Sequence, residues 1–549
     1  MVLSTVLLLA TVSGATEDAG VLPHVQTWQL HEVVLNSSRD YEDSLRDVRV
    51  TLELTSPDGK TQSASGFWDG GRTWRVRVAP GLIGRWRWKS ICSDTANSGL
   101  HSVEGAMECV PYAGENPLYR HGPQKLSDDR THFEYADGTP YFWLACTAWN
   151  GALSPELSGW KEYLADRAAK KFTAIQFVMT QWRAAEGDRT GQKAFEGREK
   201  ITLNPRFFQR MDRMVDAVNE HGLVAAPVLL WAIQDQSGRS PGSNLPDSEC
   251  ILLARYMVAR YGAHHVIWIL GGDGKYGGEN APRWKKIGRS VFDSPHRRLA
   301  TLHPGGMNWV GDEFRDEPWY DWIGYQSGHG DDEKTLRWLI SGPPATTWAN
   351  QPVLPVINME PNYEGHVAYQ SRNVISDFMV RRASYWSLLI APTAGVTYGA
   401  HGIWYFSDVA EVPLAHSRAG VAPPWRDAMK LPGSTQMKYL RELFDGIEWM
   451  SLRPAGDLVV AQPGKSDASH FIAAARSDDG TLVVIYTPEV RELHLNLTGM
   501  KDGLRLRWFN PRTGDLSVGG PLTVDDSQAT LRTPSDGDWV LVLEKSATE

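Results

Sequence analysis

The sequence predicts an α/β fold, a (β/α)8 TIM barrel flanked by an N-terminal and a C-terminal β-sandwich domain. The chain has 549 residues, too many for one ordinary domain. Both ends carry short runs in which apolar and polar residues alternate, the period typical of half-buried strands. Between them, over about 330 residues, apolar runs alternate with segments of helical periodicity, as in a barrel of eight strands and eight helices.

Composition narrows the class of protein. Hydrophobic residues make up 42% of the chain and charged residues 22%, which suits a globular protein with a substantial core. The formal net charge is -9, so we expect no broad basic surface and no nucleic-acid partner. The 23 tryptophans outnumber the 15 phenylalanines. Most of them are needed for packing, but a flat indole is also a good platform for a sugar ring.

The first residues resemble a secretory signal. Residues 2–12 are apolar and are followed by Ser13-Gly14-Ala15, although no positively charged segment precedes them. We therefore expect a signal segment at 1–21 and a secreted or periplasmic protein. The run is too short to cross a bilayer, and no other long apolar run exists, so no membrane span is expected.

Residues 22–115 are predicted to form the N-terminal β-sandwich. The expected strands are 47–54, 74–78 and 85–89, with a turn at Pro57-Asp58-Gly59-Lys60. Cys92 and Cys109 lie close together in this strand-rich region and can pair after export. Cys146 and Cys250 sit in apolar stretches and are expected to be buried free thiols.

Residues 116–449 are predicted to form the barrel. Asn204 and Pro205 are typical of a helix N-terminus, after which Phe208, Met211, Val215 and Val218 recur at helical spacing up to Gly222. A doubly wound sheet is the structural competitor, but no Gly-rich dinucleotide fingerprint follows the first strand. The expected barrel strands are 142–145, 174–179, 224–230, 266–270, 299–302, 322–325, 353–358 and 402–406.

Strand-like alternation returns in residues 450–549, which are predicted to form the C-terminal β-sandwich. The expected strands include 481–486, 504–508 and 539–543, and Asn510-Pro511-Arg512-Thr513-Gly514 is expected to turn.

Two carboxylates follow barrel strands directly and are the candidate catalytic residues. Asp273 follows the fourth strand and Glu360 the seventh. The active site of such a barrel lies at the C-terminal ends of its strands, and glycosidic cleavage usually uses two carboxyl groups. Each residue also has a structural interpretation. Gly271-Gly272-Asp273-Gly274 has the composition of a turn, and Glu360 precedes Pro361 as a cap residue does. The catalytic interpretation is favoured because both residues fall on the same face of the predicted barrel.

Other polar and aromatic residues at strand ends are candidates for substrate binding, although each can instead be part of the core. His303 raises the possibility of a metal, but no second His or Cys lies beside it at ligand spacing, so no metal and no cofactor are expected. Serine-hydrolase and P-loop motifs are absent from the sequence. The candidates are Trp149, Gln181, Trp231, His303, Tyr325, Gln326, Tyr363 and Trp404.

The segments 270–273, 359–365, 381–386 and 398–404 together resemble the apiosidase-like glycoside hydrolases. The resemblance covers about 116–450 and implies a barrel related to the clan A retaining enzymes, with Asp273 as the general acid/base and Glu360 as the nucleophile. Clan A enzymes usually carry Asn-Glu where this chain has Gly272-Asp273. The N-terminal part is similar to a β-sandwich of unknown function, and the C-terminal part resembles a domain described as collagen-binding in collagenases.

The sequence therefore predicts a glycoside hydrolase that cleaves a glycosidic bond in a plant or algal polysaccharide by a retaining two-carboxylate mechanism. The expected partner is a polysaccharide or oligosaccharide. A non-catalytic carbohydrate- or matrix-binding protein built on a barrel scaffold is the alternative, suggested by the C-terminal resemblance. A metal-assisted hydrolase is a third option, for which the sequence offers no ligand cluster.

Overall fold

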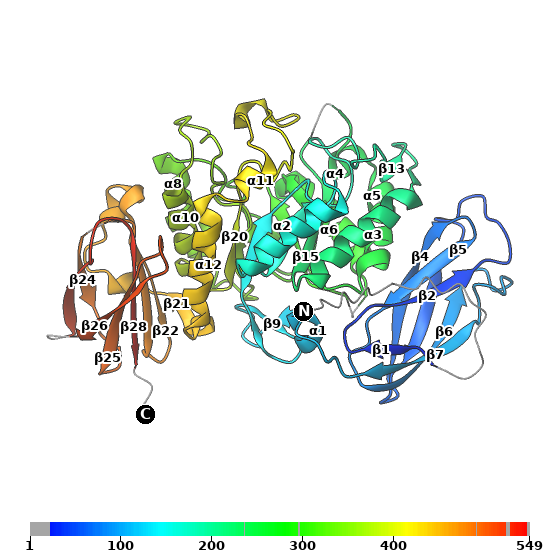
Figure 1. The fold of residues 1–549 in the computed structure, drawn as a ribbon, viewed down its shortest axis with the longest axis horizontal. Helices are drawn as coiled ribbons and strands as arrows, with labels where there is room; N and C mark the ends of the chain where they lie inside the picture. Colours follow the sequence, from blue (N-terminus) through cyan, green and yellow to red (C-terminus); the bar gives the residue numbers. More distant parts are fainter. Residues whose placement is uncertain (1–21, 235–236, 295–296, 490, 523–526, 546–549) are drawn as a thin grey trace, which may run out of the picture.

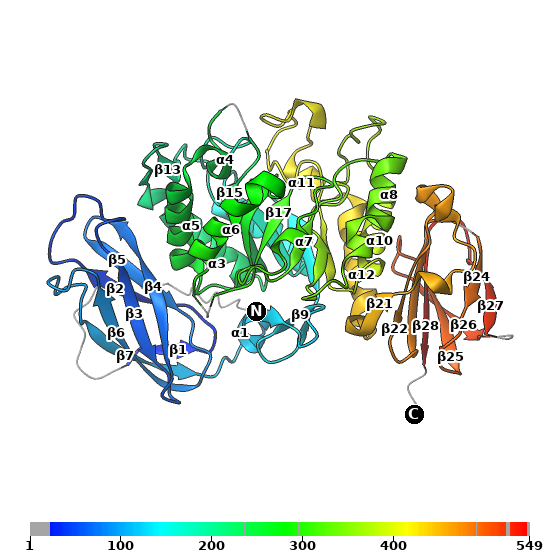
Figure 2. The same ribbon diagram turned by 180° about the vertical axis from the view of Figure 1, so that it is seen from behind.

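The computed structural model describes residues 22–234, 237–294, 297–489, 491–522 and 527–545. The expected signal segment at 1–21 lies outside these residues. Three parts follow one another in space as in the sequence, with the N-terminal domain at one end, a barrel in the centre and the C-terminal domain at the other end (Figures 1 and 2). No helix in the described ranges is long and apolar enough to cross a membrane.

The N-terminal domain is built from seven strands that enclose one apolar core. The strand β4 (Thr61–Gly70) joins its two halves, because Thr61–Ser65 pairs with β3 (Val50–Thr55) while the following residues pair with β5 (Thr73–Val78). Leu52, Val76 and Met107 pack between the halves and are completely buried. The remaining strands are β1 (His24–Gln26), β2 (His31–Asn36), β6 (Gly84–Cys92) and β7 (Glu104–Val110).

The cysteine pair expected in this domain does not form. Cys92 ends β6, whereas Cys109 on β7 faces Gly84 at the opposite end of β6. Eight residues of extended chain separate the two positions, about 26 Å at the rise of a strand, and a disulfide requires Cα atoms within about 7 Å. Sequence proximity was therefore a misleading signal, and the prediction was wrong. All four cysteines are buried and free, which confirms the prediction for Cys146 and Cys250.

Eight parallel strands form the central sheet, which confirms the predicted barrel. Their order is β17-β16-β15-β12-β11-β20-β19-β18. Strands that follow one another in the sequence are therefore neighbours in the sheet, and the first strand, β11, pairs with the last, β20. The exception is the seam between β17 and β18, the two ends of this order. The strands are β11 (Trp143–Thr147), β12 (Ala174–Val178), β15 (Val224–Trp231), β16 (Trp268–Gly274), β17 (Ala300–Pro304), β18 (Ile323–Tyr325), β19 (Val356–Asn358) and β20 (Gly395–Tyr398).

The predicted position of the eighth strand was wrong. It is β20, whereas residues 402–406 form a turn in which the Phe406 amide donates to the Gly402 carbonyl. Both segments are short, apolar and buried, and periodicity alone does not distinguish a buried strand from a buried turn. The segment 402–406 instead covers the end of the barrel, where Trp404 reaches the cavity described below.

Helices surround the barrel. Helix α3 (Pro205–Glu220) begins as predicted, since the Asn204 side chain accepts a hydrogen bond from the Arg206 amide and Pro205 occupies the first turn. Phe208, Met211 and Val218 are completely buried on its inner face. The other long helices are α2 (Leu157–Ala169), α5 (Asp247–Tyr261), α6 (Ala281–Val291), α8 (Glu333–Ser341), α10 (Asp377–Leu389) and α12 (Pro432–Asp445).

The barrel closes between β17 and β18 through a side chain. In the described part of the chain no backbone ladder pairs these two strands, and the Thr301 hydroxyl bridges them instead. It donates to the Trp322 carbonyl at 2.7 Å and accepts from the Gly324 amide at 3.2 Å. The cylinder is therefore complete, with a polar side chain at its seam.

The C-terminal domain packs against α10 (Figure 1). Buried Arg381 on α10 donates two hydrogen bonds to Asp538, at 2.9 and 3.0 Å, and the Tyr385 and Tyr486 rings stack nearly parallel at 4.9 Å. The domain has a six-stranded sheet, β21-β22-β23-β28-β25-β26, and a two-stranded sheet, β24-β27. The strands are β21 (Leu452–Pro454), β22 (Ala473–Ser477), β23 (Leu482–Thr487), β24 (Glu492–Asn496), β25 (Leu504–Phe509), β26 (Leu516–Pro521), β27 (Gln528–Arg532) and β28 (Trp539–Lys545).

A buried network of charged side chains joins the N-terminal domain to the barrel. Arg260 on α5 donates to Asp212 on α3 at 2.6 Å and to Asp69 on β4 at 2.8 Å. Arg77 on β5 donates to the same Asp212 carboxylate at 2.8 Å. Since Arg260 is completely buried, these carboxylates compensate its charge, and the network ties the N-terminal domain to the barrel.

Candidate active site

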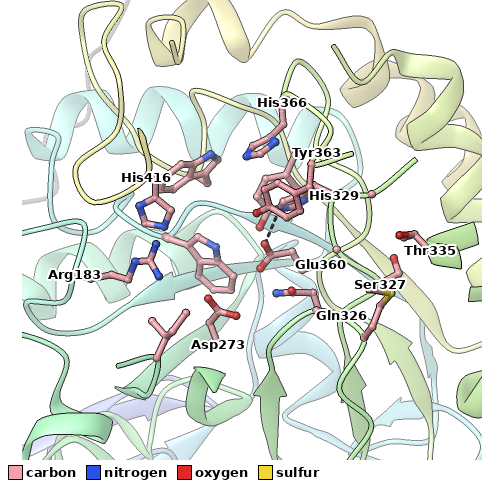
Figure 3. Close-up of a pocket in the computed structure, with 18 of the residues that line it drawn as sticks. Arg183, Asp273, Gln326, Ser327, His329, Thr335, Glu360, Tyr363, His366 and His416 are labelled. Carbon is pink, nitrogen blue, oxygen red and sulfur yellow. Dashed lines mark hydrogen bonds and ion pairs between the residues drawn. The ribbon is translucent and has the colours of Figure 1, made fainter. Parts of the chain in front are cut away.

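A cavity of about 320 Å³ opens at the C-terminal ends of the barrel strands (Figure 3). Asp273 and Glu360 both line it, one from β16 and the other from the residues after β19. The position agrees with the general location of active sites in this fold. The two candidate catalytic carboxylates, 87 positions apart in the sequence, therefore meet in one cavity.

Glu360 lies between two histidines. His329 Nε2 is 2.9 Å from Glu360 Oε1, and His303 Nε2 is 3.2 Å from Glu360 Oε2. The carboxylate is only 7% exposed. Burial alone would raise its pKa, but the interactions of the carboxylate with the two imidazoles outweigh burial and hold the pKa of Glu360 well below its usual range. Glu360 is therefore held as a carboxylate, the form required of a nucleophile.

The surroundings of Asp273 shift its pKa in the opposite direction to that of Glu360. Asp273 lies near the end of β16 with φ +45°, a left-handed conformation that is uncommon for a non-glycine residue. This agrees with the turn-like composition around it. Among the described residues, no side-chain hydrogen bond or ion pair reaches its carboxyl group. Burial, and then the nearby Glu360 charge, raises the pKa of Asp273, which favours the protonated form required of a general acid.

A buried hydrogen-bond network fixes the strand end that carries Glu360. Asn358, the last residue of β19, donates to the Ser327 hydroxyl at 2.9 Å and to the Ser387 hydroxyl on α10 at 3.0 Å. The Gly328 amide donates to the Glu360 carbonyl at 3.1 Å. The segment carrying His329 and the segment carrying Glu360 are thus tied together through backbone and side chain, which sets the position of the imidazole relative to the carboxylate.

Aromatic rings make up much of the cavity wall. The Trp149 and Trp182 rings contact the Trp231 ring, with centroid distances of 5.4 and 4.2 Å. Trp231 also occupies the space beside Gly272, where an added Cβ would lie 2.6 Å from a ring carbon. A side chain larger than that of glycine has no room at position 272, because the Trp231 ring and, at 2.7 Å, Cγ1 of Val228 occupy the space.

Five of the eight candidate binding residues line the cavity, namely Trp149, Trp231, Gln326, Tyr363 and Trp404. The other three lie outside it. Gln181 donates to the Phe195 carbonyl and accepts from the Ala194 amide, so its amide group holds a loop. His303 is completely buried behind Glu360, and Tyr325 packs between the Trp309 and Trp338 rings. Of these three, only His303 contacts a candidate catalytic group.

Several lining residues were not among the candidates. His329 lies four positions beyond the end of β18, and its role depends on contact with Glu360, which no local pattern reveals. Trp182 and Arg183, which follow Gln181 at the end of the second strand and belong to the same candidate strand end, do line the cavity. Burial lowers the pKa of His366 to about 2 and that of His416 to about 4, so both rings are neutral near pH 7. The missed residues also include Tyr369.

Within the described residues, no group of three or more His, Cys, Asp or Glu side chains could hold a metal ion. His303 and His329 instead contact the Glu360 carboxylate. The chemistry that these residues offer is proton transfer and nucleophilic attack by two carboxyl groups in opposite protonation states.

A parallel eight-stranded barrel with two carboxylates at its mouth is an arrangement that many glycosidases share. Residues 127–451, more than half of the chain, match the family described as "Apiosidase-like, catalytic domain". The chain belongs to this family of glycoside hydrolases. Residues 24–93 match a "Domain of unknown function", and residues 454–544 match a "Putative collagen-binding domain of a collagenase". No curated protein sequence matches the chain.

Solved structures share the fold. One named "Glycoside hydrolase" has a TM-score of 0.68 and 22% identity, and covers 80% of this chain and 100% of its own. A glycoside hydrolase family 5 protein from Bacteroides vulgatus ATCC 8482 has a TM-score of 0.69 and 21% identity, with coverage of 80% and 96%. A "putative glycoside hydrolase" from the same organism has a TM-score of 0.71 and 17% identity, and covers 95% of this chain and 100% of its own.

Proposed function

We propose that this protein is a retaining glycoside hydrolase that acts on a plant or algal polysaccharide, with Glu360 as nucleophile and Asp273 as general acid/base. The observation that carries the proposal is the opposite shift of two pKa values in one cavity, lowered for Glu360 and raised for Asp273. Two carboxyl groups whose surroundings separate their pKa values are typical of an acid and a nucleophile that work together.

The proposed reaction has two steps. In the first, Glu360 attacks the anomeric carbon and forms a glycosyl-enzyme, while Asp273 gives its proton to the departing glycosidic oxygen. In the second, the Asp273 carboxylate takes a proton from water, whose oxygen attacks the anomeric carbon and breaks its bond to Glu360. The sugar leaves with its original anomeric configuration. Such a mechanism requires the two carboxyl groups to be roughly 5–5.5 Å apart in the substrate complex.

The cavity wall supports a carbohydrate as the substrate. The indole rings of Trp149, Trp231 and Trp404 line the cavity, together with the polar side chains of Gln326 and Tyr363. Sugar rings combine apolar faces with hydroxyl groups at their edges, so a wall of this composition suits them. We also propose export from the cytoplasm, on the basis of the apolar residues 2–12.

The test is reducing-sugar release from pectic, hemicellulosic and algal polysaccharides by the wild type, Glu360→Gln and Asp273→Asn. We expect release from at least one polymer, a decrease of several orders of magnitude in Glu360→Gln, and retained configuration of the product by NMR. An inverted product would contradict the nucleophilic role of Glu360. Glycan binding without turnover by any form would favour the alternative of a non-catalytic binding protein, which is suggested by the C-terminal match.

A further inference from the structure

We propose that the cleft between the N-terminal domain and the barrel is a second binding site, which takes an anionic saccharide and is separate from the catalytic cavity. The cleft encloses about 830 Å³, within the range of small-molecule binding sites. One wall consists of β3, β4 and β5, and the other of α5, the end of α6 and Arg297-Arg298. The domain that forms the first wall has no assigned function.

The cleft lies at the opposite end of the barrel from the catalytic cavity. Trp268, the first residue of β16, lines the cleft, whereas Asp273, near the end of the same strand, lines the catalytic cavity. Five residues of extended strand separate them, about 17 Å. A saccharide in the cleft therefore cannot be the part of a substrate that undergoes cleavage.

The walls of the cleft are fixed before any ligand binds. Arg77 lines the cleft and is 8% exposed, and its guanidinium belongs to the buried network with Asp212 and Arg260 that joins the two parts. Tyr256 of α5, also in the wall, donates to the Trp68 carbonyl at 3.0 Å. Binding would therefore cost little reorganisation of the protein.

The wall of the cleft carries an excess of positive charge. The described charged side chains in its wall are six arginines and a single carboxylate, Asp293. Arg46, Arg77, Arg255 and Arg297 are each paired with a carboxylate. In the part of the chain that the structure describes, Arg49 and Arg298 have no carboxylate within ion-pair distance. The cleft therefore contains guanidinium charge that the protein itself leaves uncompensated.

Arg298 is the centre of the proposed site. Its Nε donates to the Gly262 carbonyl at 3.2 Å, and no other hydrogen bond from its side chain is found within the described ranges. Burial alone lowers the pKa of Arg298 to about 10, with no neighbouring carboxylate to offset it. The guanidinium groups of Arg49 and Arg298, which no described carboxylate neutralises, favour a ligand that brings negatively charged acceptor oxygens.

The aromatic residues of the cleft favour a sugar as the carrier of that charge. Trp28 and Trp68 are partly exposed and line the same space as Arg298. A flat indole packs on the apolar face of a sugar ring, while a guanidinium binds a carboxylate or sulfate through two parallel hydrogen bonds. A uronate and a sulfated sugar share this chemistry, and a neutral sugar lacks it.

The test is calorimetric binding to the full chain carrying Glu360→Gln, so that no turnover is needed. The probes are an oligogalacturonate, a sulfated carrageenan oligosaccharide, a neutral cello-oligosaccharide and inorganic sulfate. We expect at least one acidic oligosaccharide to bind, with Arg298→Gln weakening it by tenfold or more. Whichever acidic probe binds identifies carboxylate or sulfate as the recognised group. Arg87→Gln, which removes an exposed arginine of the same domain outside the cleft, should leave the affinity unchanged.

Three results would overturn the proposal. They are equal affinity of the acidic probes in Arg298→Gln and its parent, equal affinity for the neutral probe, and inorganic sulfate binding as tightly as the saccharides. If Arg298→Gln does not fold, Arg298→Lys, which keeps the charge but loses the planar fork, and Arg49→Gln provide the same comparison. Because the measurement requires no catalysis, its result is independent of whether the wild type hydrolyses any polymer.

Discussion

Each oxygen of the Glu360 carboxylate lies against an imidazole, since His329 Nε2 is hydrogen-bonded to Oε1 at 2.9 Å and His303 Nε2 lies 3.2 Å from Oε2. The two histidines are not equivalent. His329 lines the cavity, while His303 is completely buried behind the carboxylate. One side of Glu360 is thus held by a group that substrate can approach, and the other by a group enclosed in the barrel.

Replacing His329 should shift the pH dependence of activity. His329→Ala removes a hydrogen bond that lowers the pKa of Glu360, so this pKa rises. Attack requires the ionised form, and the acidic limb of kcat/KM therefore moves to higher pH. Near neutral pH we expect a decrease of about 10- to 100-fold, since a hydrogen bond to a charged group contributes about 1.5–3 kcal/mol. A pH–rate profile that keeps its acidic limb would contradict this role.

Asp273→Asn should remove the alkaline limb of the same profile. The raised pKa of Asp273 keeps the acid protonated to higher pH than an ordinary aspartate, and activity is lost as pH rises through that pKa. Without the acid, cleavage of substrates with poor leaving groups should slow by about 10²- to 10⁴-fold. Azide, which needs no general base, should restore turnover of activated aryl glycosides and give a glycosyl azide. Absence of this rescue would argue against the acid/base assignment.

Gly272→Ala should destabilise the protein through Trp231. The new Cβ would lie 2.6 Å from a Trp231 ring carbon, and overpacking of this kind costs about 1–3 kcal/mol. Urea unfolding measures the effect. Gly456→Ala is the matched control, because no atom lies within 4 Å of its added Cβ. Combining Gly272→Ala with Trp231→Ala should recover part of the loss, and strictly additive effects would show that the two residues do not interact.

Arg381→Ala should weaken the attachment of the C-terminal domain. The substitution removes both Arg381 hydrogen bonds from the buried Asp538 carboxylate, 1% exposed, which keeps the Tyr486 hydroxyl at 3.1 Å and Arg512 at 3.9 Å. Breaking such a buried pair costs about 3–5 kcal/mol. The exposed pair of Arg476 and Asp457 lies in the same domain, and Arg476→Ala should cost at most about 1 kcal/mol. Chemical unfolding of both variants makes the comparison. Equal losses would mean that the buried pair does not hold the interface.

Much of the fold could be predicted because buried parallel strands are continuous apolar runs. Seven of the eight expected barrel strands coincide with observed strands, from β11 to β19. The eighth failed because residues 402–406 are as apolar as β20 while serving to cover the barrel end. The cysteine pair failed for a different reason, since residues close in sequence lie at opposite ends of adjacent strands.

The site was predictable only where a residue follows a strand directly. Asp273 and Glu360 meet this condition, and the topology brings them together. His329 and His416 belong to longer connections whose path no periodicity describes. Gln181 also follows a barrel strand, but its side-chain amide is hydrogen-bonded to the backbone of residues 194–195. The sequence does not reveal this contact, because it depends on the position of that loop in the folded protein.

The Thr301 seam has a consequence for how the barrel opens. Elsewhere neighbouring barrel strands pair through backbone ladders, whereas between β17 and β18 the Thr301 hydroxyl bridges the middle of the gap and the Asp321 amide donates to the Ala300 carbonyl beside it. Partial unfolding that leaves the rest of the sheet intact should therefore begin there. Amide hydrogen exchange should be fastest, among the central strands, at this junction. His303 on β17 and Gln326 after β18 lie on either side of this junction. Transient separation of the two strands would therefore remove the contact between His303 and Glu360, and activity would be lost before the protein unfolds globally.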